Sequence, residues 1–263
     1  MDLSQIKMVV SDMDGTLLNS KHQVSDRFFE LFKSLANRNI RFVAASGRQY
    51  HSIVDKLDPI REDILVIAEN GALVKDKERE LLVTPIEHHL KNDLLSIVDH
   101  IEGAHAMLCG KYNAYFDGKS APFLEQLKEY YSSYEILDNL HDVTDEIIKI
   151  AVYHSINAEE YIYPAMKGLE SQVKVKVSGL NWVDLNHSNA HKGHALEKLM
   201  NAYGLKSHEV LVFGDYNNDL EMLELSDYSF AMANAHPNVK QIAKYETLSN
   251  DEFGVEHILE QLV

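Results

Sequence analysis

Two aspartates, two positions apart, follow a short apolar run near the start of the sequence. The run is Lys7–Ser11 (KMVVS), and D-M-D-G-T-L occupies the next six positions. The glycine permits a sharp turn, so Asp12 and Asp14 can both be placed beside one reacting group. A bare pair of this spacing is more often a solvated turn. The buried strand expected before it and the Gly-Thr-Leu after it favour a chemical role for both acids.

Three further polar groups stand where apolar runs end or a helix begins. Ser46-Gly47-Arg48 follows RFVAA, and a hydroxyl beside backbone N–H groups at a helix start suits a phosphate oxygen. Lys192 opens a helical pattern and could neutralise a phosphoryl group. Residues 214–219 (GDYNND) follow VLVF and offer the hard oxygen ligands that Mg²⁺ takes. These groups predict a shared site for a phosphate and a magnesium ion.

The elements that position these groups are strands of continuous Val, Ile and Leu. We expect strands at 7–11, 41–44, 64–68 and 210–213. Such runs are typical of strands buried on both faces of a parallel sheet. Phe28, Leu31, Phe32 and Leu35 form a helical stripe after a possible cap at Ser25. The alternation predicts an α/β fold with a doubly wound, Rossmann-like parallel sheet, whose ligands bind at the carboxyl ends of the strands.

The middle of the chain has a different pattern. Val173, Val175 and Val177 alternate with two lysines, which indicates a sheet with one face exposed to water. We expect helices at 88–101, 123–131 and 158–169, and strands at 105–109, 114–117, 147–154, 173–178 and 182–186. We therefore predict a core of residues 1–82 and 188–263 that is interrupted by an inserted α+β domain at 83–187.

Composition limits the classes of partner and the location. The 263 residues carry 25 Lys+Arg and 41 Asp+Glu, a formal charge of −16, which disfavours nucleic acid as a partner. A single cysteine, Cys109, excludes an internal disulfide and a four-cysteine zinc site. No apolar stretch is long enough for a spanning helix, and the start lacks a basic leader, so we expect a cytoplasmic protein without membrane contact. No G-x-G-x-x-G dinucleotide motif is present.

The order D-x-D-G-T, S-G-R, K and G-D-x-x-N-D resembles the haloacid dehalogenase (HAD) superfamily of phosphatases. The inserted α+β region resembles the type-IIB cap of the Cof-type subgroup. The resemblance extends over the chain through ENGA at 69–72, MANAH at 232–236 and NDEFGV at 250–255. Two departures are Ala233, where members often carry glycine, and Tyr216 at a variable position of the acidic loop.

The resemblance implies a role for each residue. Asp12 is expected to be the nucleophile that forms an aspartyl-phosphate, and Asp14 the general acid and base. The Asp12 carboxylate, the Asp14 carbonyl and Asp215 are expected to hold Mg²⁺. The expected phosphate-binding groups are Ser46, Lys192 and Asn218 with the backbone N–H groups of Met13 and Gly47. Thr16 and Asp219 are expected to support these residues, Asp219 by orienting the loop and Lys192, with direct binding of the metal by Asp219 as the alternative.

Charge supports the same scheme, because four clustered aspartates without a cation would be severely destabilising. The leading hypothesis is a Mg²⁺-dependent phosphatase that acts on a small phosphate monoester, such as a sugar phosphate. Two alternatives stay open. One is a phosphomutase of the same superfamily, and the other is a noncatalytic phosphate-binding or receiver-type protein. We expect a small phosphorylated metabolite as partner and a monomer or small homo-oligomer.

Overall fold

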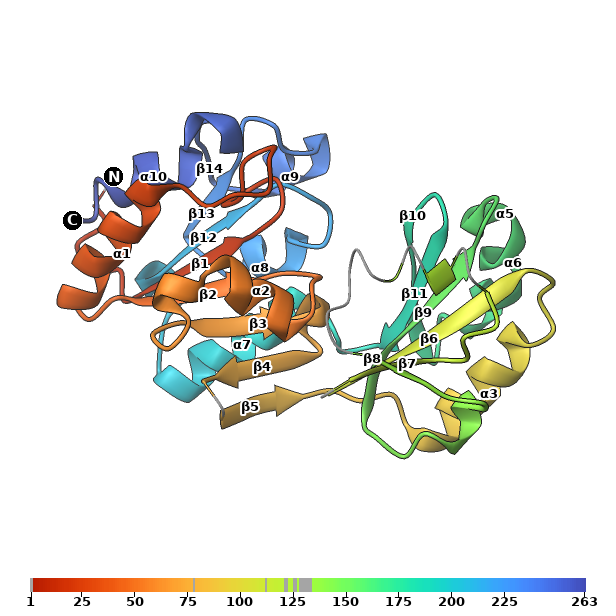
Figure 1. Cartoon of the computed structure of the whole chain (residues 1–263). Coiled ribbons are helices and arrows are strands. Elements are labelled where there is room, and N and C mark those ends of the chain that lie inside the picture. Colours follow the sequence, from red (N-terminus) through yellow and green to blue (C-terminus); the bar gives the residue numbers. More distant parts are fainter. Residues whose placement is uncertain (1, 78, 112, 121–122, 125–126, 128–133) are drawn as a thin grey trace. The chain divides into compact units, whose positions relative to one another are not determined.

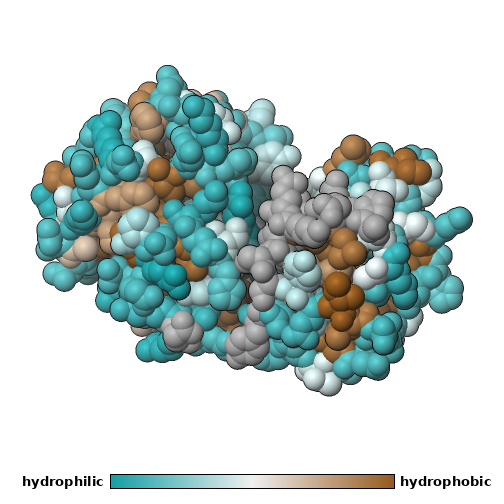
Figure 2. Space-filling model, viewed as in Figure 1, coloured by the Kyte–Doolittle hydropathy of each residue, from teal (hydrophilic) through white to brown (hydrophobic). Residues whose placement is uncertain are grey.

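The computed structural model describes the chain except residues 1, 78, 112, 121–122, 125–126 and 128–133. The chain forms two compact units (Figure 1). The first unit comprises Met1–Leu82 and His191–Val263, and the second comprises Val83–Ala190. Figure 2 shows that most of the visible surface is hydrophilic, with smaller hydrophobic patches. No helix in the described ranges is both long and apolar enough to cross a membrane.

An eight-stranded sheet forms the centre of the first unit, in the order β14-β13-β12-β1-β2-β3-β4-β5. The strands are β1 (Met8–Asp12), β2 (Arg41–Ala45), β3 (Leu65–Ala68), β4 (Leu73–Asp76), β5 (Arg79–Val83), β12 (Val210–Gly214), β13 (Tyr228–Ala231) and β14 (Tyr245–Glu246). All pairs from β14 to β3 are parallel. Every residue of β1 and β12 is buried, as expected for central strands covered on both faces. The predicted doubly wound α/β fold is confirmed.

The edge formed by β4 and β5 was not predicted. β4 runs antiparallel to β3, so the sheet is mixed at this edge. Leu73 and Val74 of β4 are buried, but Lys75 and Asp76 are only partly buried, and β5 has no fully buried residue among those described. The apolar runs of β4 and β5 are therefore too short to give the continuous pattern that identifies the central strands in the sequence.

Helices on both sides of this sheet supply its cover. They are α1 (Asp26–Asn37), α2 (Tyr50–Lys56), α7 (Lys192–Tyr203), α8 (Leu220–Glu224), α9 (Pro237–Ile242) and α10 (Gly254–Leu259). The predicted stripe of α1 is confirmed, because Phe28, Leu31, Phe32 and Leu35 are all buried. Phe28 contacts Phe42 of β2 with ring centroids 5.0 Å apart. This contact anchors α1 on the sheet beside β1.

The strand order reverses at β1, which lies between β2 and β12. After β1 the chain continues to β2 and toward one edge of the sheet. It later returns through β12 on the opposite side of β1. In open parallel sheets, the crevice outside the carboxyl ends at such a point is where ligands bind. Asp12 ends β1 and Asp215 directly follows β12, so both acids stand at this crevice.

The second unit is an α+β structure around a six-stranded sheet, in the order β10-β11-β9-β6-β7-β8. Its strands are β6 (Ala104–Gly110), β7 (Ala114–Phe116), β8 (Tyr134–Ile136), β9 (Ile147–His154), β10 (Val173–Gly179) and β11 (Trp182–His187). Only the pair β7–β8 is parallel among the described pairings of this sheet. Helix α3 (His88–Val98) packs on the same face as the short helices of residues 158–169 (Figure 1).

One predicted helix of this unit is interrupted. Instead of a helix at 158–169, the chain forms α5 (Ala158–Tyr161), α6 (Tyr163–Met166) and a 3-10 turn (Lys167–Leu169). Pro164 is the reason, because it has no N–H to continue the bonding of α5 and its ring clashes with the preceding turn. The predicted helix at 123–131 lies largely outside the described residues, and β8 was not predicted.

The cap of α1 provides a test of this local structure. Ser25 Oγ accepts a hydrogen bond of 3.0 Å from Phe28 N and donates one to Glu256 Oε1. We predict that Ser25→Ala lowers the free energy of unfolding of the first unit by about 1–2 kcal/mol. Urea unfolding followed by circular dichroism measures the change. Ser34→Ala in the same helix is the control, because Ser34 only bonds back to Glu30 O, and an equal loss in both variants contradicts the prediction.

Candidate active site

The backbone of the loop after β1 passes very close to the carboxylate of Asp215. Asp12 is 5% exposed and ends β1. Gly15 has φ +79°, and a Cβ there would lie 2.2 Å from Asp215 Oδ2. Glycine is therefore needed at position 15 for the turn and for the contact. Thr16 Oγ1 also donates to Asp215 Oδ1 at 3.4 Å.

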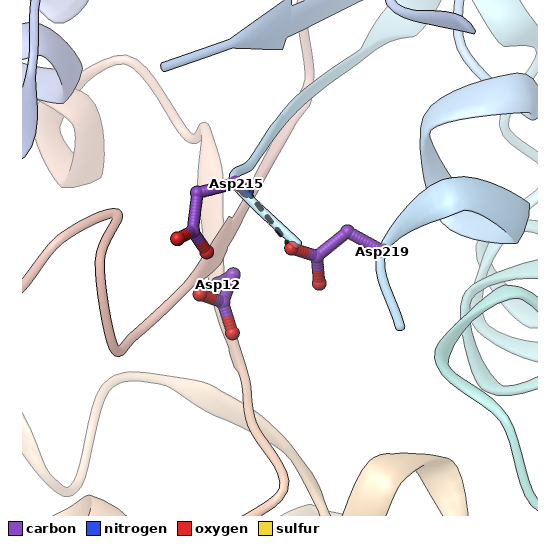
Figure 3. A group of neighbouring side chains, drawn as sticks. All are labelled: Asp12, Asp215 and Asp219. Atoms are coloured by element: carbon purple, nitrogen blue, oxygen red, sulfur yellow. Dashed lines mark hydrogen bonds between the residues drawn. The ribbon is translucent and has the colours of Figure 1, made fainter. Parts of the chain in front are cut away.

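Three carboxylates converge beside this loop. Asp12, Asp215 and Asp219 each offer one oxygen, and these oxygens all lie within 4.8 Å of one another (Figure 3). Asp219 is fully buried, and its Oδ2 accepts hydrogen bonds from the backbone N–H of Asp215 at 3.0 Å and of Tyr216 at 3.1 Å. These bonds fold the acidic loop back on itself and aim Asp215 at Asp12.

A buried ammonium group joins the three acids. Lys192 is the first residue of α7 and is 0% exposed. Its Nζ lies 2.5 Å from Asp12 Oδ1 and 2.6 Å from Asp219 Oδ1. Gly71 fixes the start of α7, because it has φ +99° and a Cβ there would lie 2.4 Å from the carbonyl oxygen of His191. The turn after β3 therefore packs directly against the backbone that presents Lys192.

The electrostatics of this cluster favour a bound cation. Three carboxylates and one ammonium leave a formal charge of −2. Burial and the negative charge of Asp219 raise the pKa of Asp12 well above its usual range, and they raise the pKa of Asp215 to about 6. Burial lowers the pKa of Lys192, but Asp12 and Asp219 outweigh it, so the net pKa is raised and Lys192 is protonated. Hard carboxylate oxygens with this charge fit a divalent ion.

The second aspartate of the D-x-D pair has different surroundings. Arg48 binds the Asp14 carboxylate with two hydrogen bonds of 2.6 Å, from Nε to Oδ2 and from Nη2 to Oδ1. His22 Nδ1 lies 3.3 Å from Asp14 Oδ1. Burial raises the pKa of Asp14, but the hydrogen bonds and charge of Arg48 outweigh this effect and lower it. Arg48 follows Ser46 and Gly47 in the sequence, but its contact with Asp14 was not predicted.

The residues expected to hold phosphate lie on the neighbouring strand ends. Ser46 is 1% exposed, and its Oγ accepts a hydrogen bond of 3.1 Å from Arg48 N. Asn218 Nδ2 donates to Asn70 Oδ1 at 3.1 Å. A Cβ at Gly47 would lie 3.1 Å from the same Asn70 oxygen. Asn70 thus links two of the expected phosphate-binding loops. It follows β3 at the same end of the sheet, which is the signal that could have identified it.

The side chain of Met13 is completely buried. It stands between the two acids in the sequence but is removed from solvent, so only its backbone is available for a role at the site. The prediction for Met13 concerned its backbone N–H, and that prediction stays untested.

Two asparagines from distant segments brace the loop after Asp12. Asn234 Nδ2 donates to Gly15 O at 2.8 Å, and Asn250 Nδ2 donates to Leu18 O at 2.9 Å. The asparagines also bind each other, because Asn250 N donates to Asn234 Oδ1 at 3.1 Å. Ser20 N donates to Asp251 Oδ1 at 2.8 Å in the same region. The MANAH and NDEFGV segments therefore hold the loop that follows the D-x-D pair.

The family to which the sequence can be matched is consistent with this arrangement of acidic and basic residues. The family model of the haloacid dehalogenase-like hydrolases matches residues 9–259, which is nearly the whole chain. The chain belongs to this family. The resemblance seen in the sequence is thereby confirmed.

Relatives of this HAD chain are phosphatases. The 5-amino-6-(5-phospho-D-ribitylamino)uracil phosphatase YbjI of Escherichia coli is 30% identical, and the match covers 98% of this chain and 96% of the relative. A solved structure from Eubacterium rectale is 26% identical with a TM-score of 0.92, covering 98% of this chain and 100% of that one. A solved HAD subclass IIB sugar phosphatase is 19% identical with a TM-score of 0.81, covering 97% and 98%. The likeness to the sugar phosphatase shows only that the two proteins share a fold.

The HAD chain is therefore a phosphatase. Its hydrolase class follows from the family and from relatives named as phosphatases over their full length. The structure brings Asp12, Lys192, Asp215 and Asp219 into direct contact or close proximity, and it pairs Asp14 with Arg48. The finer assignment of roles to these residues is a proposal.

The asparagine brace makes a testable prediction for this HAD phosphatase. Asn234→Ala removes the bonds to Gly15 O and from Asn250 N, so the loop after Asp12 loses its support. We expect kcat for p-nitrophenyl phosphate to fall about tenfold, since small displacements of reacting groups are costly. Steady-state kinetics measure the effect. Asn37→Ala is the control, because Asn37 is exposed at the end of α1 and outside the site, and equal losses in both variants contradict the role of Asn234.

Proposed function

We propose that the protein hydrolyses small phosphate monoesters by a Mg²⁺-dependent route through an aspartyl-phosphate on Asp12. The single observation that carries the proposal is the buried cluster in which Lys192 binds Asp12 while Asp215 approaches it. A carboxylate that is buried, oriented and beside a cation is a suitable nucleophile for a phosphoryl group. Its fixed position at the end of β1 reduces the entropy lost on the way to the transition state.

Mg²⁺ is the metal that the donor set favours, because the candidate ligands are all oxygens. The Asp12 carboxylate, the Asp14 backbone carbonyl and Asp215 would hold it. When bound, the ion supplies charge neutralisation between the anionic nucleophile and the anionic phosphate. Asp219 would contribute indirectly, since its oxygens are engaged by Lys192 and by two backbone N–H groups of the loop.

The reaction proceeds in two displacements. In the first, the Asp12 carboxylate attacks phosphorus in line, the bond from phosphorus to the ester oxygen breaks, and the leaving alcohol takes a proton from Asp14. In the second, water attacks the aspartyl-phosphate, gives a proton to Asp14 and releases inorganic phosphate. The first step needs the protonated form of Asp14, which the negative charge of a bound phosphate ester favours. Arg48 stabilises the carboxylate form, which accepts the proton from water in the second step.

The remaining residues would bind the transferring group. Ser46, Lys192, Asn218 and the backbone N–H groups of Met13 and Gly47 are proposed to contact the phosphoryl oxygens. Phosphoryl transfer depends mainly on positioning and on stabilisation of charge, so a cradle of donors is the expected contribution of the protein. Asn70 supports this cradle, because it contacts both Asn218 and the position of Gly47.

The substrate is proposed to be a small phosphorylated metabolite that the cap helps to select. We assign catalysis to the core, residues 1–82 and 188–263, and selection to the cap, residues 83–187. The relative from Escherichia coli is named for a ribityl phosphate joined to a uracil, so sugar and polyol phosphates are the first substrates to test. We further propose a cytoplasmic protein that works as a monomer or small homo-oligomer without nucleic acid.

The role of Asp12 is tested by replacing one oxygen. Asp12→Asn keeps the shape of the side chain and removes its charge and nucleophilicity. We predict that Mg²⁺-dependent release of phosphate from p-nitrophenyl phosphate falls about 10³-fold or more, with folding retained by circular dichroism. Activity within tenfold of the native protein contradicts the proposal. Transfer of phosphate to a second sugar phosphate, instead of its release, would support the phosphomutase alternative.

The pKa of Asp215 predicts how metal binding depends on pH. Because that pKa is raised to about 6, Asp215 is a carboxylate above this pH and carries a proton below it. The proton must leave before the metal binds, so we predict that the Mg²⁺ concentration for half-maximal activity rises about tenfold for each unit that the pH falls below 6. Activity titrations at constant ionic strength measure this. A half-maximal Mg²⁺ concentration that does not change between pH 5 and 7 contradicts the prediction.

A matched pair of variants completes this test. Asp215→Asn should reduce the dependence on pH and greatly weaken the response to Mg²⁺. Asp63→Asn makes the same change at an exposed position outside the site and should alter neither.

A further inference from the structure

An exposed aromatic ring stands directly after one of the candidate metal ligands. Large apolar side chains are exposed at four described positions of the first unit: Tyr216, Tyr245, Leu248 and Phe253. Of these, Tyr216 is the one that adjoins a carboxylate of the candidate site, because it follows Asp215 in the loop after β12. Its side chain is about half exposed, at 52%. The proposed mechanism uses Asp215, Asn218 and Asp219 of this loop and leaves Tyr216 without a role.

The backbone of Tyr216 is held on both sides by Asp219. Tyr216 N donates to Asp219 Oδ2 at 3.1 Å, and Asp219 N donates to Tyr216 O at 3.0 Å. Asp219 is itself fully buried and paired with Lys192. The base of the tyrosine side chain is therefore fixed relative to the charged groups of the site. A tyrosine ring has only two rotatable bonds to order when it binds a ligand, so its contact costs little entropy.

His236 supports the ring of Tyr216 from one side. Their ring centroids lie 5.6 Å apart at an interplanar angle of 77°, which is the edge-to-face geometry that aromatic pairs favour. His236 N donates to Asp215 O at 2.8 Å, and His236 Nδ1 accepts a hydrogen bond of 3.2 Å from Asn238 N. Asn238 Nδ2 donates in turn to Asn217 Oδ1 at 3.1 Å. The two rings, which we call the aromatic rim, are thus tied to the acidic loop at several points.

The aromatic rim lies at the carboxyl end of the core sheet, close to the loop after β1. Tyr216 follows β12 and His236 follows β13, and these two strands pair in parallel. Asn234, two positions before His236, donates to Gly15 O in the loop after β1 at 2.8 Å. The loops after β1, β12 and β13 are therefore contiguous at the edge where open parallel sheets bind ligands.

The direction of the displacement determines where the rest of the substrate lies. In an in-line reaction the leaving oxygen stands opposite the attacking carboxylate, so the leaving group extends away from Asp12. Asp12 is 5% exposed, and its partners Lys192 and Asp219 are fully buried, so the protein closes that side of the site. The leaving group therefore extends toward solvent, past the exposed side chains at the carboxyl end of the sheet. The aromatic rim is one of the surfaces that it meets there.

We propose that Tyr216 stacks on a planar ring in the leaving group of the substrate, with His236 as its fixed support. This inference rests on the proposed function and specifies its substrate class: a small phosphate monoester whose alcohol carries an aromatic or heteroaromatic ring. The exposed face of a tyrosine ring attracts another planar ring through dispersion and through the opposite partial charges of ring faces and edges. A saturated group of the same size loses part of this attraction and binds more weakly.

Two phosphate esters that differ in the saturation of one ring test this substrate class. Benzyl phosphate and cyclohexylmethyl phosphate have the same carbon skeleton and both release a primary alcohol, but only the benzyl ring is planar and aromatic. We expect kcat/KM to be about tenfold higher for benzyl phosphate, mainly through a lower KM. Benzylphosphonate and cyclohexylmethylphosphonate, which are not hydrolysed, should bind in the same order when their Kd values are measured by isothermal titration calorimetry.

Substitutions of Tyr216 assign the preference to its ring. Tyr216→Leu keeps an apolar side chain without an aromatic face and should reduce the ratio of the two kcat/KM values to about twofold or less. Tyr216→Phe keeps the face and should retain the ratio. Tyr203→Leu is the matched control and should also retain it, because Tyr203 is a partly exposed tyrosine at the opposite end of α7 from Lys192. Circular dichroism checks that each variant folds.

The outcomes are separable from those of the proposed function. A ratio near one in the native protein overturns the inference. So does a ratio that is unchanged in Tyr216→Leu, including the case in which both esters lose activity equally, because that loss would reflect a structural role of the side chain. The proposed function stands in these cases if either ester is hydrolysed in a Mg²⁺-dependent way. If neither is hydrolysed, the proposed function fails, and the Kd values of the phosphonates then decide whether Tyr216 binds a planar ring.

Discussion

The contact of buried Lys192 with Asp12 and Asp219 is the interaction on which the rest of the site depends. Removing a lysine from water is costly, and only paired carboxylates make its full burial possible. The pairing in turn fixes the plane of the Asp12 carboxylate. It also ties together two segments that are 180 positions apart in the sequence. With Asp215 added, the cluster keeps excess negative charge, so the same contact explains both the oriented nucleophile and the requirement for a cation.

The topology of the sheet makes this contact possible. Because β1 lies between β2 and β12, the loops that follow these strands lie close together at the carboxyl end of the sheet, although β2 and β12 are far apart in the sequence. The turn after β3 then packs through Gly71 against the start of α7, which presents Lys192. Asn234 and Asn250 complete the support from the far side of the sequence by binding the loop after Asp12. The site is therefore formed by segments from the whole core, and its residues lie far apart in the sequence.

The central strands and the polar residues that follow them were predictable from the sequence. The elements and contacts that were not predicted were missed for physical reasons. Buried parallel strands leave continuous apolar runs, so β1, β2, β3 and β12 and the polar groups that follow them were recognised. β4 and β5 were missed because edge strands are only partly buried. The break at Pro164 was missed because the apolar periodicity continues across it. Arg48 and Asn70 act through contacts with side chains from other loops, and such contacts leave no periodic signal. Their position at strand ends was the only clue.

The central claim is that Asp12 itself carries the phosphoryl group during turnover. Borohydride reduces an acyl phosphate to an alcohol, so reduction of acid-quenched enzyme would convert a phosphorylated aspartate into homoserine. Peptide mass spectrometry after turnover of p-nitrophenyl phosphate then locates the modified residue. The account predicts homoserine at position 12, only when substrate and Mg²⁺ are both present. Modification at Asp14 or Asp215, or none under conditions in which the enzyme turns over, would contradict it.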